Sequence, residues 1–106
     1  MTMLALAPLS AIPDNRPLRV EHDFLDFVLV RSGDDVYALE DRCSHGDIPL
    51  SEGELAGCLL ECWLHGSVFD VRTGIPQTPP AASPVKTFPV TIDEVDGTPT
   101  VFVEIG

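Results

Sequence analysis

Positive charge is scarce in this chain. Six Lys and Arg residues stand against 17 Asp and Glu, which gives a formal net charge of −11 at pH 7 over 106 residues. Such a surface repels nucleic-acid phosphates and anionic membranes, so we expect neither as a partner. The same field attracts a basic patch on a protein partner.

Long apolar runs and helical patterns are also missing. No stretch approaches the ~20 apolar residues that a membrane-spanning helix needs. Residues 1–11 contain no basic segment and no twin-Arg pair, so we expect no export signal and predict a cytoplasmic location. Ten prolines and eight glycines interrupt the chain, and no twelve-residue segment keeps a helical period without one of these breakers. The helix content should therefore be low.

The length leaves little room for more than one core. A chain of 106 residues with 44% hydrophobic side chains fits a single globular domain, which we predict to span residues 1–106. There is no space for both a redox module and a substrate-binding catalytic domain. A carrier or binding module is favoured over a self-sufficient enzyme.

Short runs rich in β-branched and aromatic residues alternate with turn residues along the chain. The predicted strands are residues 18–21, 24–31, 36–39, 54–56, 58–61, 67–71, 86–93 and 98–105. Turn clusters at residues 32–35, at Gly57 and at Asp96-Gly97 predict hairpins. This pattern predicts an all-β fold, a small antiparallel sandwich or barrel. Its predicted core positions are Phe27, Leu29, Phe69, Phe88, Val90, Val101 and Val103.

The proline-rich segment 75–84 (IPQTPPAASP) interrupts the strand pattern. Proline cannot donate to a strand ladder, so we expect this segment not to pair within a sheet. It should serve as a rigid covering loop or a connection.

Two short segments combine cysteine with histidine. Cys43-x-His45 and Cys62-x-x-His65 are separated by sixteen residues, and a glycine follows each histidine. Each segment follows a predicted strand, so the two loops can converge at one tip of a β domain. The third cysteine makes the number odd, which favours thiols used as ligands over a disulfide framework.

Two thiolates and two imidazoles are compatible with two kinds of metal centre. A structural zinc site uses this set in a tetrahedron, with Cys and His pairs at finger-like spacings that the chain does not show. A Rieske [2Fe–2S] centre needs two Cys on one iron and two His on the other. Each loop offers one ligand to each iron, so the spacing favours the iron–sulfur centre.

The two boxes resemble the cluster-binding boxes of Rieske ferredoxins. Residues 41–47, 50–53 (LSEG) and 69–74 (FDVRTG) are similar to the ferredoxin components of bacterial ring-hydroxylating dioxygenases, and the resemblance runs from Leu18 to the C-terminus. It implies that Cys43, His45, Cys62 and His65 bind one Rieske-type [2Fe–2S] cluster, in a cluster-binding subdomain of two loops over residues 41–84. It also implies that Pro79-Pro80 shields the cluster.

The function implied by the resemblance is electron transfer in aromatic hydrocarbon catabolism. A soluble carrier of this kind passes single electrons from a flavoprotein reductase to a terminal Rieske non-haem iron oxygenase and is not itself an enzyme. The oxygenase selects the organic substrate, which therefore cannot be read from this chain.

Some positions depart from relatives. Trp63 stands where many relatives have proline. High-potential Rieske proteins carry a disulfide between the boxes, whereas this chain has Ile48 and Leu64 at those positions. Ser67 matches a hydrogen-bonding serine of those proteins, but Phe69 replaces a tyrosine. Fewer donors to the sulfurs predict a low potential, about −150 mV, and a value above about +100 mV would contradict this.

Three other functions compete with this one, and several further residues allow more than one interpretation. A zinc-dependent interaction module would be colourless, unlike a brown-red iron–sulfur protein. The small subunit of an assimilatory nitrite reductase shares the fold but usually lacks the ligands, and the N-terminal half of an oxygenase subunit would need a longer chain. We expect Cys58 to be a buried strand thiol. Trp63 is either loop packing or a docking side chain, and Asp47, Glu52 and Glu54 are either a solvated rim or a docking surface.

Overall fold

The computed structural model describes residues 2–14, 16–22, 25–33, 35–42, 48–62, 66–78 and 83–105. Ten strands form three antiparallel sheets, ordered β1-β10-β9, β2-β3-β4-β8 and β5-β6-β7. The strands are β1 Thr2–Pro8, β2 Leu18–His22, β3 Leu25–Ser32, β4 Asp35–Glu40, β5 Glu54–Ala56, β6 Leu59–Glu61, β7 Val68–Asp70, β8 Thr87–Phe88, β9 Val90–Val95 and β10 Thr98–Ile105. Two 3-10 turns, η1 Leu9–Ala11 and η2 Leu50–Glu52, are the helical elements of the described residues.

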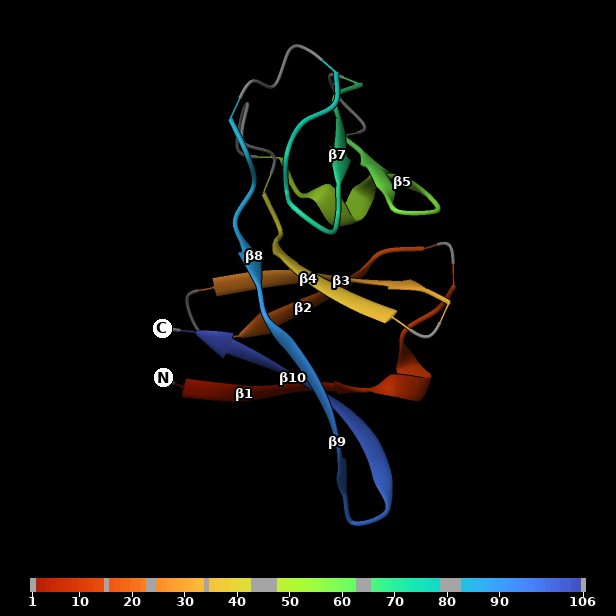
Figure 1. The fold of residues 1–106 in the computed structure, drawn as a ribbon, viewed down its shortest axis with the longest axis vertical. Coiled ribbons are helices and arrows are strands. Elements are labelled where there is room, and N and C mark those ends of the chain that lie inside the picture. Colours follow the sequence, from red (N-terminus) through yellow and green to blue (C-terminus); the bar gives the residue numbers. More distant parts are fainter. Residues whose placement is uncertain are drawn as a thin grey trace.

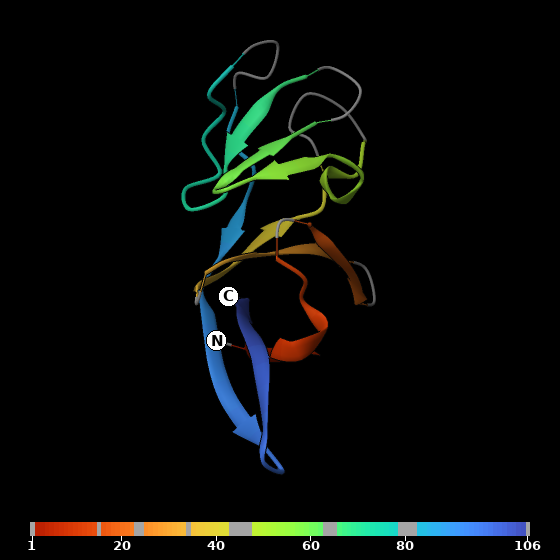
Figure 2. The same cartoon turned by 90° about the vertical axis from the view of Figure 1, so that its right-hand side faces the viewer.

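The molecule is elongated, with extents of 44 × 27 × 19 Å. The sheet β5-β6-β7 occupies one end of the long axis, and the β9–β10 hairpin projects at the other end (Figures 1 and 2). The sheet β2-β3-β4-β8 lies between them. Among the described residues, no helix has the length and hydropathy to cross a membrane.

Strand β3 separates two hydrophobic cores. Its side chains alternate between the faces of the middle sheet, and the four residues from Phe27 to Val30 are fully buried. Val28 and Val30 belong to the core beneath the small sheet. Phe27 and Leu29 belong to the core shared with β10, where the rings of Phe27 and Phe88 pack edge to face at 5.0 Å. The middle sheet is therefore buried on both faces and ties the small sheet to the rest of the fold.

The all-β antiparallel prediction is confirmed, and so is most of the predicted core. Six of the seven predicted core residues are buried, and Val90 is half-buried. The hairpin turns at Gly57 and at Asp96-Gly97 join β5 to β6 and β9 to β10 as predicted. Strand β1 was not predicted from the sequence; it pairs with β10 along one edge of its sheet.

The prediction of one strand over residues 86–93 is wrong. Pro89 separates β8, which pairs with β4, from β9, which pairs with β10. Proline has no N–H for a ladder bond, so the chain changes sheets at this residue. The Pro89 carbonyl still accepts a hydrogen bond from the Glu104 N–H at 3.0 Å.

The proline-rich segment does pair with a strand at its start, contrary to prediction. Phe69 and Pro76 form an isolated antiparallel bridge. The ring nitrogen of Pro76 is not needed, because the Ile75 carbonyl accepts from the Asp70 N–H and the Gln77 N–H donates to the Val68 carbonyl.

Cys58 also differs from expectation. It lies in the turn before β6 and is half-buried, not in a strand and fully buried. Its thiol donates a long hydrogen bond to the Ser32 hydroxyl at 3.5 Å.

Candidate metal centre

Cys62 is the predicted ligand that the structure describes. It directly follows β6, its side chain is fully buried, and it packs in the same core cluster as Leu60 and Phe69. The thiol is free of any disulfide. A buried thiol without a disulfide partner, at the end of a strand, fits a thiolate-binding metal such as iron or zinc once it is deprotonated.

Backbone hydrogen bonds close the loop that begins at Cys62. The Cys62 N–H donates to the Ser67 carbonyl at 2.7 Å, and the Gly66 N–H donates to the Cys62 carbonyl at 2.9 Å. Gly66 has φ +72°, a backbone conformation that a residue with a Cβ rarely adopts. The two ends of the second box are therefore hydrogen-bonded to each other, and the positive φ of Gly66 explains the glycine after His65.

The other predicted ligands, Cys43, His45 and His65, lie outside the described residues, as do Asp47, Trp63, Leu64 and Pro79-Pro80. The described residues by themselves form no group of three or more His, Cys, Asp or Glu side chains suited to a metal. The stems of both boxes are described, and each follows a strand as predicted: β4 ends at Glu40, and β6 ends at Glu61.

Packing brings the flanks of the two boxes together. Ile48, just beyond the first box, packs against the core cluster that contains Cys62. Leu50 of η2 is fully buried in the same cluster. Although β4 and β6 belong to different sheets, the chain returning from the first box therefore shares a core with the first ligand of the second box.

Thr78 connects the proline-rich segment to the second box. Its hydroxyl accepts a hydrogen bond from the Val68 N–H at 2.9 Å and donates to the Gly66 carbonyl at 3.4 Å. The Gln77 N–H donates to the Val68 carbonyl at 2.6 Å. The chain is thus held against the second box immediately before Pro79. Sequence reasoning missed this residue; its position directly before Pro-Pro was the available signal.

The outer face of the small sheet places two like charges side by side. Glu54 of β5 and Glu61 of β6 are direct cross-strand partners, and both are exposed. Like charges at this spacing destabilise a strand pair. The next pair on this face includes Leu59, which is 41% exposed. This surface, defined by Glu54, Leu59 and Glu61, adjoins Cys62.

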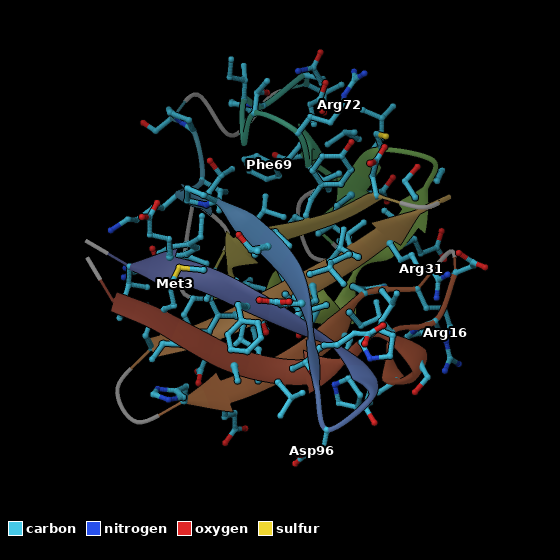
Figure 3. All side chains as sticks on the ribbon, turned by 60° about the horizontal axis from the view of Figure 1, so that its bottom comes forward. Met3, Arg16, Arg31, Phe69, Arg72 and Asp96 are labelled. Atoms are coloured by element: carbon cyan, nitrogen blue, oxygen red, sulfur yellow. The ribbon has the colours of Figure 1, made fainter. Side chains whose placement is uncertain are left out.

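Asp70 on the same sheet already has a cationic partner, Arg72. Its carboxylate accepts hydrogen bonds from the Arg72 guanidinium at 2.8 and 3.0 Å. These side-chain bonds, together with the Arg72 N–H, hold the pKa of Asp70 below its usual value, and the carboxylate raises the pKa of Arg72 in turn. Figure 3 shows Arg72 and Phe69 at this end of the molecule. Glu54 and Glu61 have no such cation among the described residues.

Comparison with known proteins gives one consistent result. Residues 2–89 match the family described as Rieske [2Fe-2S] domain. The biphenyl dioxygenase ferredoxin subunit of Pseudomonas sp. (strain KKS102) is 35% identical over 97 residues, which cover 91% of this chain and 89% of that protein.

Solved structures show the same fold. The ferredoxin of carbazole 1,9a-dioxygenase from Nocardioides aromaticivorans IC177 superposes with a TM-score of 0.85 at 33% identity, covering 95% of this chain and 97% of that one. A chain in the complex of reduced oxygenase and oxidized ferredoxin in carbazole 1,9a-dioxygenase superposes with a TM-score of 0.82 at 34% identity, covering 95% and 91%.

Proposed function

This chain belongs to the Rieske [2Fe–2S] domain family, and we propose that it carries single electrons from a flavoprotein reductase to a terminal Rieske non-haem iron oxygenase. The resemblance to dioxygenase ferredoxins is confirmed by relatives that are ferredoxin subunits and not catalytic subunits. The cofactor is a Rieske-type [2Fe–2S] cluster. The cytoplasm is the compartment we propose for this exchange.

The buried thiol of Cys62 at the tip of the small sheet is the observation that carries the proposal. We assign the cluster to Cys43, His45, Cys62 and His65, the one set of two Cys and two His that the two boxes offer. Residues 41–84 form the cluster-binding subdomain within a single domain of residues 1–106. A bound [2Fe–2S] cluster accepts and releases one electron.

The residues of this chain hold the site and keep water from it. The hydrogen bond from the Gly66 N–H to the Cys62 carbonyl joins the two ends of the second box, and the core around Phe69 and Leu60 excludes solvent from the Cys62 side. Thr78 holds the start of the proline-rich segment at the second box. This contact supports the proposal that Pro79-Pro80, directly after Thr78 in the sequence, shields the cluster.

Electron paramagnetic resonance of the reduced protein tests the assignment. A cluster with mixed cysteine and histidine ligands gives a lower average g value than an all-cysteine [2Fe–2S] cluster. We expect that signal, together with two irons and two inorganic sulfides per chain. A colourless protein that contains zinc and no sulfide would disprove the assignment.

Phe69→Tyr should raise the reduction potential. Phe69 is fully buried in the core cluster of Cys62 and has no hydroxyl, so it contributes to the low potential, near −150 mV, that we propose. A new hydroxyl donor to a cluster sulfur favours the reduced state by about 0.5–1.5 kcal/mol, or roughly 20–65 mV for one electron. Film voltammetry measures the shift. Phe27→Tyr, in the other core, is the matched control and should leave the potential unchanged; an equal shift in both variants would refute the argument.

The surface of Glu54, Leu59 and Glu61 is the place where we expect the oxygenase to dock. A costly pair of like charges beside an exposed leucine suits a basic partner surface with an apolar centre. Glu54→Lys with Glu61→Lys should raise the concentration for half-maximal electron transfer to the oxygenase about tenfold at low ionic strength, and salt should reduce the difference.

Asp93→Lys with Glu94→Lys provides the control for that experiment. It makes the same change in net charge on exposed positions of β9, at the opposite end of the molecule. If both double variants weaken transfer equally, net charge and not this surface governs docking.

A further inference from the structure

A buried carboxylate lies at the base of the first box. The Asp41 side chain is fully buried, although Asp41 lies on the loop that leaves β4, beyond its last residue. Burying a carboxylate is costly unless hydrogen bonds and a nearby cation compensate it. The identity of its partners therefore indicates what the carboxylate does.

Both carboxylate oxygens bind one residue on the far side of the box. The Ser51 N–H donates to Asp41 Oδ1 at 2.7 Å, and the Ser51 hydroxyl donates to Oδ2 at 2.5 Å. Ser51 belongs to η2, and the residue before it, Leu50, is buried in the core. The two residues are ten positions apart in the chain, and residues 42–50 between them include Cys43 and His45.

An arginine of the middle sheet is the third partner of the Asp41 carboxylate. Arg19 of β2 lies 3.7 Å from Asp41 Oδ2 and hydrogen-bonds Asp26 of β3 at 2.9 Å. The Asp41 N–H donates to the Asp26 carbonyl at 2.9 Å. Contacts with β2 and β3 therefore hold Asp41 against the middle sheet, and Ser51 is hydrogen-bonded to Asp41.

We propose that Asp41 and Ser51 form a clasp that closes the first ligand loop at its base and positions Cys43 and His45 for the cluster. Asp41 and Ser51 are thus positioning residues, and the inference rests on the proposed assignment of Cys43 and His45 as ligands. Holding the ends of a loop together lowers the entropy lost when its side chains bind. An open clasp lets the ligands leave the iron more often, so the cluster is lost faster.

The test measures the rate at which the intact protein loses its cluster to excess iron chelator, followed by visible absorbance. Asp41→Ala removes both bonds and should accelerate loss about tenfold or more. Ser51→Ala removes the hydroxyl bond and should have a smaller effect in the same direction. Asp41→Asn is the rescue, because its amide can accept from the Ser51 N–H and donate to the hydroxyl; its loss rate should stay within about threefold of the parent.

Asp26→Ala is the matched control. It removes another carboxylate bound to Arg19 but leaves the Asp41–Ser51 bonds and the bond to the Asp26 backbone carbonyl in place, so its loss rate should lie much closer to that of the parent than to that of Asp41→Ala. Hydrogen exchange adds a local readout: Asp41→Ala should speed exchange in residues 42–50 and leave residues 98–105 unchanged. If the clasp only contributed to global stability, exchange would become faster in both segments.

Three results would overturn the clasp: cluster loss from Asp41→Ala no faster than from Asp26→Ala, equal exchange changes in both segments, or Asp41→Asn as labile as Asp41→Ala. If Asp41→Ala does not fold, Ser51→Ala is judged by the same rate and exchange measurements. Failure of the proposed function is separate, since the parent protein would then lack the Rieske signal before any substitution.

Discussion

Cys62→Ala is expected to abolish cluster binding. Cys62 is fully buried in the core of the small sheet and is the proposed first ligand of the second box. An iron bound through two thiolates cannot keep its coordination when one is removed, and alanine offers no substitute ligand. The variant should be isolated without brown-red colour, with iron and sulfide near zero per chain.

Cys58→Ala is the matched control for that result. Cys58 is four positions earlier, half-buried in the turn before β6, and its thiol contacts the Ser32 hydroxyl. It should bind the cluster at full occupancy with an unchanged spectrum. If Cys62→Ala retains two irons, or Cys58→Ala loses them, the ligand assignment of the second box is wrong.

Gly53→Ala is expected to destabilise the cluster-binding end strongly. A Cβ at Gly53 would lie 1.7 Å from the Glu61 carbonyl oxygen and 3.2 Å from the Leu50 carbonyl oxygen. Both obstacles are backbone, so relief requires β6 to shift just before Cys62. Overpacking costs about 1–3 kcal/mol and occasionally more, and we expect the upper end of this range because the clash is with backbone. Denaturant unfolding of the holoprotein measures the loss, and the cluster should be bound at reduced occupancy.

Gly57→Ala separates crowding from backbone strain. Gly57 has φ +61° and open space around its Cβ position. Alanine there costs only the strain of the left-handed backbone conformation, about 1–2 kcal/mol of unfolding free energy. The cluster occupancy should stay unchanged. Equal losses of unfolding free energy for the two variants would contradict the crowding at Gly53.

Local patterns in the chain were enough to predict much of the fold. The alternation of Phe27, Leu29, Val101 and Val103 marked core strands because side chains of a strand alternate between its faces. The turn at Asp96-Gly97 marked a hairpin because those residues accept positive φ. These signals are local, and the structure has the predicted strands at these positions.

Non-local contacts account for the failures. Strand β1 carries a weak pattern of its own and exists because β10 offers it an edge. Residues 86–93 look like one strand, yet Pro89 divides them between two sheets. Pro76 pairs with Phe69 because its neighbours carry the hydrogen bonds. Each depends on which segments meet in space, and local propensity does not contain that information.

Residue types and their spacing were enough to predict the chemistry of the protein: the pattern of Cys43, His45, Cys62 and His65 and the net charge of −11 indicated an acidic Rieske electron carrier. Ligand types and charges are properties of the residues themselves. The residues that support this chemistry could be identified only from the packed fold. Asp41 meets Ser51, Glu54 faces Glu61, and Thr78 binds the second box only after three sheets have packed. Such contacts join residues distant in the chain, and only the packed backbone brings them within hydrogen-bonding distance.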